Sequence, residues 1–352
     1  MRRILVMGGY GFIGSHTCYS LLENNYDLFV IDSLVNSKIK SIERIKKMFM
    51  NKKIDVSGKL KFFKGDLRNK KFIDSVFEKA NDEKNPIEGV VHFAGLKAVS
   101  ESVSEPILYW ENNVIGSFNL LRSMEENNCK NIVFSSSALV YGSSTNDDLL
   151  KESSKICPIN PYGSTKLAVE KMLNDIFRNG KGGWKIAILR YFNPIGAHHT
   201  GLLGENPLQR PNNIFPIIIN AAYENKQMKV YGKDWPTHDG TCIRDYIHIV
   251  DLADGHIKAL NYLFQNQSKL ISLNIGTGKG ISVLELINTF REINNVNVPF
   301  VFEKRREGDP CKLVSDNSKA KKILKWFPRN SLEEMCINGW KWKSLNPNGY
   351  NE

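Results

Sequence analysis

Tyr162 and Lys166 stand four residues apart in the segment Asn160–Lys166. On a helix this spacing places both side chains on one face, about one turn apart. A lysine ammonium stabilises a phenolate, so a neighbouring tyrosine becomes a usable base near neutral pH although a free phenol titrates near ~10. Such a base beside a hydride carrier can oxidise an alcohol. The pair alone is weak evidence, because Tyr and Lys also occur at this spacing on solvated helix faces.

A glycine-rich turn near the N-terminus is suited to a dinucleotide. Gly8, Gly11 and Gly14 follow the apolar run Ile4–Met7 and open a segment with helical spacing. Without Cβ atoms these residues let the backbone turn tightly, approach a pyrophosphate and pack helix against strand. Asp32 follows Gly14 by 18 residues, at the end of the next expected strand. A carboxylate there accepts hydrogen bonds from ribose hydroxyls and repels a 2′-phosphate, so we expect NAD as the cofactor rather than NADP.

Three consecutive serines, Ser135, Ser136 and Ser137, end the fifth apolar run of the chain. In an open α/β sheet, ligands lie beyond the carboxyl ends of the strands. Ser137 comes last and is therefore the best placed of the three to hydrogen-bond a reacting hydroxyl. We interpret Ser135 and Ser136 as small residues that leave space for a cofactor.

Six short apolar runs rich in β-branched and aromatic residues are expected to be strands. They are Ile4–Met7, Leu28–Ile31, Leu60–Phe63, Gly89–Phe93, Asn131–Phe134 and Trp184–Tyr191. Segments with helical spacing lie between most of them. This alternation predicts an α/β fold with a doubly wound, parallel-sheet Rossmann domain and helices on both faces of the sheet.

The pattern becomes less regular after Asn193, where a stretch rich in Gly, Pro, Asn and His is followed by shorter elements. We expect residues 1–193 to form the NAD-binding domain, joined by a returning segment near 241–270. Residues 194–352 are expected to form mainly a smaller α/β C-terminal domain that binds the substrate.

The composition is that of an ordinary globular protein, with 352 residues, 41% of them hydrophobic and 24% charged. No apolar run approaches the ~20 residues that span a membrane. The six cysteines include no C-x-x-C pair, so neither a metal site nor a disulfide framework is expected. The net charge of +11 fits either an anion-binding surface or a lysine-rich solvated surface. We favour the latter, because no nucleic-acid-binding motif is present, and expect a cytoplasmic enzyme that binds no nucleic acid.

Taken together, these motifs resemble those of the extended short-chain dehydrogenases/reductases, and more narrowly the UDP-glucose 4-epimerases (UDP-galactose 4-epimerases). The resemblance covers nearly the whole chain. It rests on Gly8–Thr17, Asp32–Ser37, Gly65–Asn69, His92–Val99, Ser135–Ala138, Leu189–Pro194, Arg244–His248, Asp251–His256 and Arg305–Asp309. Of these, Leu96-Lys97 and Arg305–Asp309 are the most specific to the epimerases.

The resemblance implies that a homodimer inverts C4 of a UDP-hexose through a transient 4-keto sugar, with the hydride taken by and returned from tightly bound NAD. It implies that Tyr162 is the base, that Lys166 lowers its pKa and holds the nicotinamide ribose, and that Ser137 binds the same sugar oxygen. Besides these three, the implied cofactor-binding residues are Gly8, Gly11, Phe12, Ile13, Gly14, Asp32, Ser33, Leu34, Val35, Asn36, Ser37, Asp66, Leu67, Phe93, Ala94, Gly95, Lys97, Asn112 and Phe192.

The resemblance also implies a set of residues that hold the UDP-sugar. Besides Ser137 and Tyr162, they are Asn193, Asn213, Ile214, Lys229, Tyr231, Arg244, Arg306, Asp309 and Leu313. Their chemistry suits the ligand, since arginine offers two-pronged hydrogen bonding to a diphosphate and a tyrosine ring packs against uracil.

Three alternatives stay open at this point. Leu313 aligns where some epimerases carry a bulky Tyr and others a small residue that admits N-acetyl sugars, so UDP-N-acetylglucosamine and UDP-N-acetylgalactosamine are alternative substrates. A 4,6-dehydratase on this fold usually needs an acid pair after the strand-five Ser or Thr, where this chain has Ala138-Leu139. A non-catalytic NAD-sensing regulator is more distant, because such proteins tend to lose the Tyr or the Lys. Met7 also departs from the family, which often has Thr there.

Overall fold

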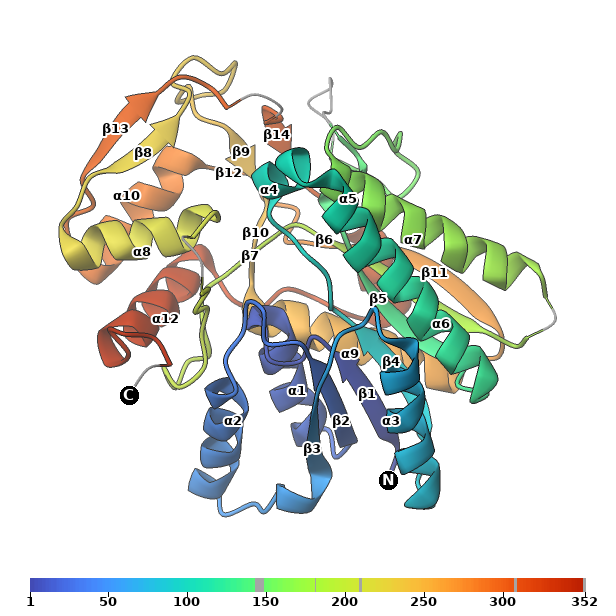
Figure 1. Cartoon of the computed structure of the whole chain (residues 1–352). Helices are drawn as coiled ribbons and strands as arrows, with labels where there is room; N and C mark the ends of the chain where they lie inside the picture. The colour runs from blue at the N-terminus through green and yellow to red at the C-terminus, as the bar shows by residue number, and fades with distance from the viewer. Residues whose placement is uncertain (143–148, 181, 209–210, 307–308, 351–352) are drawn as a thin grey trace.

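The computed structural model of the chain describes residues 1–142, 149–180, 182–208, 211–306 and 309–350. A parallel sheet of seven strands forms its centre, in the order β11-β6-β5-β4-β1-β2-β3 (Figure 1). The strands are β1 (Arg3–Met7), β2 (Asp27–Asp32), β3 (Leu60–Lys64), β4 (Ile87–His92), β5 (Asn131–Ser137), β6 (Lys185–Tyr191) and β11 (Lys269–Ile275). The six expected strands are all present, and the doubly wound α/β fold is confirmed.

The seventh strand, β11, is a correction to the expected six. It pairs with β6 along its whole length and forms one edge of the sheet. Lys269 at its start is exposed, and Leu270 and Ser272 are only partly buried. An edge strand is only partly covered, so β11 lacks the continuous apolar character by which the central strands are recognised.

Helices cover both faces of this sheet (Figure 1). One face carries α1 (Phe12–Glu23), α2 (Lys40–Asn51), α9 (Ile249–Gln265) and α11 (Ser318–Leu324). The other carries α3 (Lys70–Asp82), α6 (Gly116–Glu126) and α7 (Pro161–Arg178). Along β1, Ile4 and Val6 enter the first core whereas Leu5 and Met7 enter the second. Burial on both sides explains why the central strands are apolar at every position.

A smaller core lies beside the sheet, formed by α8 (Ile214–Glu224), α10 (Val283–Asn294) and α12 (Leu332–Leu345). Short strands pair in three further small sheets: β7 (Asn193–Ile195) with β10 (Tyr246–His248), β8 (Met228–Tyr231) with β13 (Phe300–Glu303), and β9 (Ile243–Arg244) with β12 (Ile281–Ser282) and β14 (Lys312–Leu313). Although α9 and β11 come late in the chain, they pack with the large sheet. A domain boundary at residue 193 with a returning segment near 241–270 stays a prediction.

Three helical segments directly precede α6: α4 (Val99–Ser104), α5 (Pro106–Tyr109) and a π-helical turn at Trp110–Ile115. Two 3-10 turns lie at Ser57–Lys59 and Ala138–Val140. In the described ranges, no helix has both the length and the apolar character needed to cross a membrane.

Candidate functional site

Tyr162, Lys166 and Ser137 meet at the carboxyl end of the central sheet. The helix α7 begins directly before Tyr162, because Pro161 fits its first turn and the Asn160 side chain accepts a hydrogen bond from the Gly163 N–H at 2.9 Å. Ser137 is the last residue of β5. The hydroxyls of Ser137 and Tyr191 share hydrogen bonds with the Tyr162 hydroxyl. Two strand ends and one helix start therefore converge on a single phenol oxygen.

The electrostatics of this corner are set by burial. Burial raises the pKa of Tyr162 to about 12, while the hydrogen bonds from Ser137 and Tyr191 act in the opposite direction. Burial lowers the pKa of Lys166 to about 8, and the charge of Glu170 opposes this shift. The Lys166 ammonium donates to the Ser135 carbonyl at 2.9 Å and lies 6.0 Å from the centre of the Tyr162 ring. Most of Lys166 is thus protonated at neutral pH, close to the phenol.

Ser135 and Ser136, which we interpreted as small residues that make space, have polar partners of their own. The Ser135 hydroxyl lies 2.6 Å from His256 Nε2, and the Ser136 hydroxyl donates to Glu170 at 2.5 Å. Glu170 is ion-paired with Arg190, whose Nε and Nη2 atoms donate at 2.9 and 2.6 Å. The pair is buried, so these contacts fix the end of β5 against α7 and β6.

The glycine-rich turn fits a pyrophosphate. A Cβ at Gly14 would lie 2.2 Å from the Gly8 oxygen, and a Cβ at Gly8 would lie 2.8 Å from the Ala94 nitrogen. Neither position tolerates a side chain, so the loop folds tightly onto itself and the end of β4. The helix α1 then begins at Phe12 with no side chain capping its N-terminus. Its first amides, including those of Phe12 and Ile13, therefore point their dipoles at a ligand site for phosphate.

Asp32 is held in place at the end of β2. Its carboxylate accepts hydrogen bonds from the Tyr10 and Leu34 amides, both at 2.9 Å, and from the Ser37 hydroxyl at 2.7 Å. A carboxylate offers roughly four acceptor positions, so about one remains for a ribose hydroxyl. Of the other predicted residues in this loop, Ser33, Val35 and Asn36 are exposed. The Asn36 side chain accepts from the Leu208 amide at 3.1 Å.

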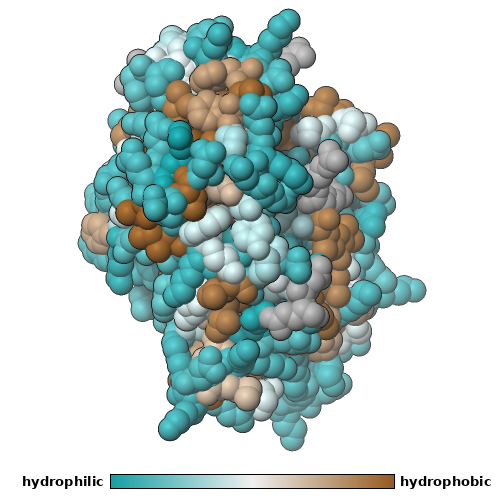
Figure 2. Space-filling view, turned by 90° about the vertical axis from the view of Figure 1, so that its left-hand side faces the viewer, coloured by the Kyte–Doolittle hydropathy of each residue, from teal (hydrophilic) through white to brown (hydrophobic). Residues whose placement is uncertain are grey.

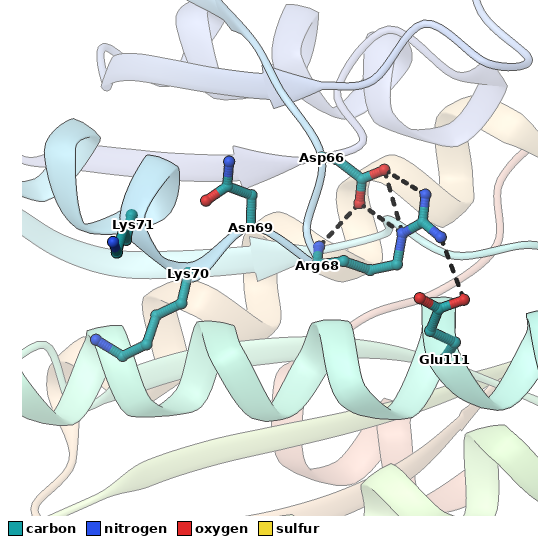
Figure 3. Close-up of a pocket in the computed structure, with 6 residues that line it drawn as sticks. All are labelled: Asp66, Arg68, Asn69, Lys70, Lys71 and Glu111. Atoms are coloured by element: carbon teal, nitrogen blue, oxygen red, sulfur yellow. Dashed lines mark hydrogen bonds and ion pairs between the residues drawn. The ribbon is translucent and has the colours of Figure 1, made fainter.

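Asp66 lies at an open hollow of about 550 Å³ (Figure 3). Its carboxylate is held by the side chain of Arg68, with Nε at 3.1 Å and Nη2 at 2.8 Å, and these hydrogen bonds lower the pKa of Asp66. Arg68 also contacts Glu111 at 3.3 Å. Asp66 alone among the residues that line the hollow is a predicted site residue. Leu67 is buried and would contact a Cβ placed at Gly116.

Four further residues predicted to bind the cofactor are Phe93, Ala94 and Gly95, which follow β4, and Phe192, which follows β6. The Ala94 amide donates to the Met7 oxygen at 2.9 Å, and the Phe93 ring lies 4.8 Å from the His256 ring. A Cβ at Gly95 would lie 3.8 Å from Lys166 Nζ, so Gly95 lies beside the predicted catalytic lysine. Phe192 is buried in a cluster that includes Leu313, which joins a predicted cofactor residue to a predicted substrate residue.

Asn112 is only half-buried on the π-helical turn. Its neighbour Asn113, which we did not predict, is buried and makes the structural contacts. The Asn113 side chain accepts from the Leu96 amide at 2.8 Å and donates to the Leu96 carbonyl at 3.0 Å. Only the three-dimensional position of the two asparagines distinguishes them.

Glu205 is a second residue that sequence reasoning missed. One of its carboxylate oxygens lies 3.4 Å from Lys97 Nζ and 3.4 Å from the Asn213 amide nitrogen. Lys97 was predicted to bind the cofactor and Asn213 the substrate, so Glu205 connects the two sets. Ile214 follows Asn213 as the first residue of α8. No sequence signal marks Glu205, whereas Tyr191 had one, since it ends β6 directly before Phe192 and Asn193.

Of the residues predicted to bind UDP, Tyr231 and Arg244 lie on short strands, and Arg306 and Asp309 come between β13 and β14. The Arg306 guanidinium lies 3.8 Å above the centre of the Tyr231 ring, and Arg244 Nη2 lies 3.8 Å from an Asp309 oxygen. Leu313 is the register partner of Arg244 across β14 and β9. Residues 307 and 308 of the Arg305–Asp309 motif lie outside the described residues.

Two further predicted substrate residues make contacts between neighbouring short strands. Lys229 is exposed on β8 and pairs with Glu303 at 2.9 Å. Asn193 begins β7, where its amide donates to the Asp245 carbonyl at 3.0 Å. Neither contact reaches Tyr162, and the roles of both residues stay predictions.

Comparison with known proteins agrees with this geometry. The family model described as GDP-mannose 4,6 dehydratase matches residues 5–338. A UDP-glucose 4-epimerase of Bacillus subtilis is 45% identical over 349 residues, which cover 99% of this chain and 98% of the relative.

Two solved structures are similar along the whole chain. A UDP-glucose 4-epimerase from Stenotrophomonas maltophila, with bound NAD and formylated UDP-arabinopyranose, has a TM-score of 0.91 and 39% identity, with 99% of each chain covered. One from Bifidobacterium longum, in complex with NAD+ and UDP, has the same TM-score, identity and coverage. The chain belongs to the UDP-glucose 4-epimerase family of extended short-chain dehydrogenases/reductases.

Proposed function

We infer that this chain catalyses the NAD-dependent C4 epimerisation of a UDP-hexose and interconverts UDP-glucose and UDP-galactose. The observation that carries this inference is the meeting of the Ser137, Tyr162 and Tyr191 hydroxyls, with the Lys166 ammonium 6.0 Å from the Tyr162 ring. The epimerases from Stenotrophomonas maltophila and Bifidobacterium longum, which bind NAD with a UDP-sugar or UDP, support it. NAD, when bound, accepts a hydride from C4 of the sugar and later returns it.

Tyr162, Lys166 and Ser137, here called the catalytic corner, carry out and support the proton transfer. Tyr162 takes the proton of the sugar 4-hydroxyl and Ser137 hydrogen-bonds the same oxygen, which fixes its orientation. Burial raises the pKa of Tyr162 to about 12, so the phenolate has to be stabilised for this step, and we assign that task to the positive charge of Lys166, 6.0 Å from the ring centre. The resulting 4-keto sugar turns about its link to UDP and presents its other face. Tyr162 then returns the proton, so the product is the C4 epimer and no net oxidation occurs.

The UDP moiety is bound away from the reacting carbon. We assign Arg244 and Arg306 to the diphosphate, Asp309 to the uridine ribose and Tyr231 to the uracil ring. Asn193, Asn213, Ile214, Lys229 and Leu313 complete the predicted substrate pocket. Binding energy from the UDP then holds the reacting hexose in place while leaving it free to turn.

The site does not select one hexose as strictly as it selects the UDP moiety. Leu313 is buried beside Phe192 and Ala138, and a leucine there is intermediate in size between the two residue types that divide the family. UDP-N-acetylgalactosamine is therefore the second candidate substrate.

We further propose that the enzyme is a homodimer. Apolar side chains are exposed on consecutive segments from α4 to α6, namely Val103, Ile107, Trp110, Ile115 and Phe118. Ile107 is 82% exposed. By contrast, hydrophilic residues predominate on the face of the smaller core, and its hydrophobic residues form separate groups (Figure 2). A second copy that covers the α4–α6 surface would bury this apolar area.

Size-exclusion chromatography with light scattering tests the dimer. Ile107→Glu and Trp110→Glu should convert it to a monomer, and a wild-type monomer would exclude the proposal. A cytoplasmic location stays a prediction.

The activity is tested with the purified protein and whatever nucleotide it retains. UDP-galactose and UDP-N-acetylgalactosamine are supplied in separate reactions, with and without added NAD, and the products are resolved by chromatography or NMR. Inversion at C4 of UDP-galactose is expected. Absence of inversion for both sugars under both conditions would refute the function.

A further inference from the structure

A short loop connects two of the residues assigned to UDP. It runs from Gly232 to Gly240, between Tyr231 and the strand that carries Arg244. The Trp235 amide donates to the Gly240 carbonyl at 3.0 Å, which closes the loop. At its end, the Thr237 hydroxyl donates to the Thr241 carbonyl at 2.7 Å. The loop therefore has a defined shape of its own.

Arg305 reaches this loop from another part of the chain. Its Nε donates to the Asp234 carboxylate at 2.8 Å, and its Nη2 donates to the Asp234 carbonyl. The guanidinium carbon lies 4.2 Å from the centre of the Trp235 ring. A planar guanidinium can stack on an indole and hydrogen-bond at its edge at the same time, which a lysine ammonium cannot do.

The two adjacent arginines, Arg305 and Arg306, thus have different surroundings. Arg305 already uses two of its donors on Asp234. Within the described part of the chain the Arg306 side chain has no hydrogen bond or ion pair, and its guanidinium lies over the Tyr231 ring at 3.8 Å. Its N–H groups remain available to a diphosphate, whereas those of Arg305 bind protein.

Gly232 directly follows Tyr231 and packs against Arg305, so it couples the positions of these two residues. Gly232 has a φ of +85°, and a Cβ there would lie 2.4 Å from Trp235 Nε1 and 3.0 Å from Arg305 Cγ. The indole and the arginine stem therefore pack directly on the backbone that follows Tyr231. The Gly232 amide also donates to the Glu303 carbonyl at 2.9 Å, which joins the loop to the strand before Arg305.

We propose that Arg305, Asp234 and Trp235 form a positioning unit, here called the Arg305 clasp, that sets the affinity for UDP without contacting it. The clasp ties the loop between Tyr231 and Arg244 to the segment that carries Arg306 and Asp309. It therefore holds all four residues assigned to the nucleoside diphosphate in one arrangement. The inference rests on the proposed function.

The clasp is at the surface, which limits the size of its effect. The side chains of Arg305 and Asp234 are 38% and 69% exposed, so solvent and salt screen their attraction. Removal of the Arg305 side chain should raise the Kd for UDP and the KM for UDP-galactose about three- to tenfold, with little change in kcat. Added salt should reduce the difference in UDP affinity between the Arg305 variant and the wild type, because it screens the Arg305–Asp234 attraction. Arg305→Lys should recover only part of the affinity.

Asp234→Ala separates the clasp from direct binding of UDP by Arg305. If the clasp positions the site, loss of Asp234 weakens UDP binding, and Asp234→Ala adds little to Arg305→Ala. If Arg305 instead binds the diphosphate, loss of its competing partner tightens UDP binding or leaves it unchanged, and the proposal is wrong.

Arg2→Ala is the matched control. Arg2 is an exposed arginine that pairs with Glu88 at 3.1 Å and stacks on Phe264 at 4.3 Å. It directly precedes β1, at the amino end of the sheet, whereas Ser137 lies at the carboxyl end. The substitution should leave UDP affinity unchanged. Arg306→Ala separates the two proposals: it should weaken UDP binding more than Arg305→Ala does.

The binding is measured by isothermal titration with UDP, after thermal melting has established that each variant is folded. If Arg305→Ala binds UDP as Arg2→Ala does while Arg306→Ala binds weakly, the clasp is refuted and the proposed UDP site stands. If Arg306→Ala also binds normally, the proposed UDP site itself is wrong. A fall in kcat at unchanged KM in Arg305→Ala would likewise refute the clasp.

Discussion

The catalytic corner and the UDP-binding residues are built in opposite ways. Tyr162, Lys166 and Ser137 are buried and sit on a long helix and a seven-residue strand of the large sheet. Arg306 is exposed on a loop and Tyr231 is only partly buried at the end of β8, and the Arg306 guanidinium stacks on the Tyr231 ring. The first region is enclosed by the sheet and its helices, whereas the second is open to solvent.

This difference matches two different tasks. Proton transfer requires atoms placed within a few tenths of an ångström, which buried hydrogen bonds provide. Binding of UDP requires that a large polar ligand enter and leave. Variants of the catalytic corner should therefore change kcat or stability, and variants of the UDP-binding residues should change KM.

Tyr162→Phe gives the largest expected effect. Loss of the hydroxyl removes the general acid–base and should lower kcat about 10²- to 10⁴-fold while NAD stays bound. Initial rates with UDP-galactose, together with NAD released by denaturation, measure the two quantities. Tyr262→Phe on α9 is the control and should behave as wild type. Near-wild-type turnover of Tyr162→Phe would show that the catalytic corner is misassigned.

Glu170→Gln tests how much the buried ion pair between Glu170 and Arg190, next to the catalytic corner, contributes to stability. The substitution leaves Arg190 as a buried charge without its counter-ion, which typically costs about 3–5 kcal/mol of unfolding free energy. Urea unfolding measures the loss. Glu126→Gln, at an exposed glutamate paired with Lys70 and Arg122, should change stability far less. Equal effects of the two substitutions would contradict the contrast between the regions.

Tyr231→Ala tests the UDP-binding side. Loss of the ring that we assign to uracil should raise KM for UDP-galactose about tenfold, in the range measured for stacking on a base, with kcat nearly unchanged. Steady-state kinetics separate the two parameters. A large fall in kcat would mean that this region also takes part in the chemistry.

Acid should lower the free energy of unfolding gradually. At any one pH this is the smallest of the expected effects. Burial lowers the pKa of His92 and His248 to about 3 and of His256 to about 4, below the ordinary value of 6.5. The unfolded chain therefore binds more protons than the folded one below pH ~6.5, so stability is complete above that pH and falls as the pH approaches these folded-state values.

Buried carboxyls act against this trend. Burial raises the pKa of Asp245, Asp251 and Asp254, which changes stability in the opposite direction. His16 and His198, whose pKa values are also lowered by burial, bring the number of such histidines to five, so their effect should prevail. Urea unfolding from pH 7 to pH 4 measures the net result, and constant stability over this range would contradict it.

Much of the fold could be predicted because its signals are local. The six apolar runs, the glycine turn before α1 and the position of Ser137 at the end of β5 all follow from the order of residues in short segments. The edge strand β11 could not be recognised in this way, since partial exposure removes the apolar pattern. Glu205 could not be found in this way because its partners Lys97 and Asn213 come from other segments, whereas the position of Tyr191 at the end of β6 was a signal that could have been used.

The sequence by itself determined the elements and the residue types available for chemistry, including the Tyr162–Lys166 spacing on one helix face. The tertiary structure alone decided which of these residues meet. Parallel strands return through crossovers, so their carboxyl ends converge and bring Ser137, Tyr162 and Tyr191 to one oxygen. The contact of Arg305 with Asp234 spans 71 residues. No periodicity encodes such a contact, because it depends on how separate elements pack.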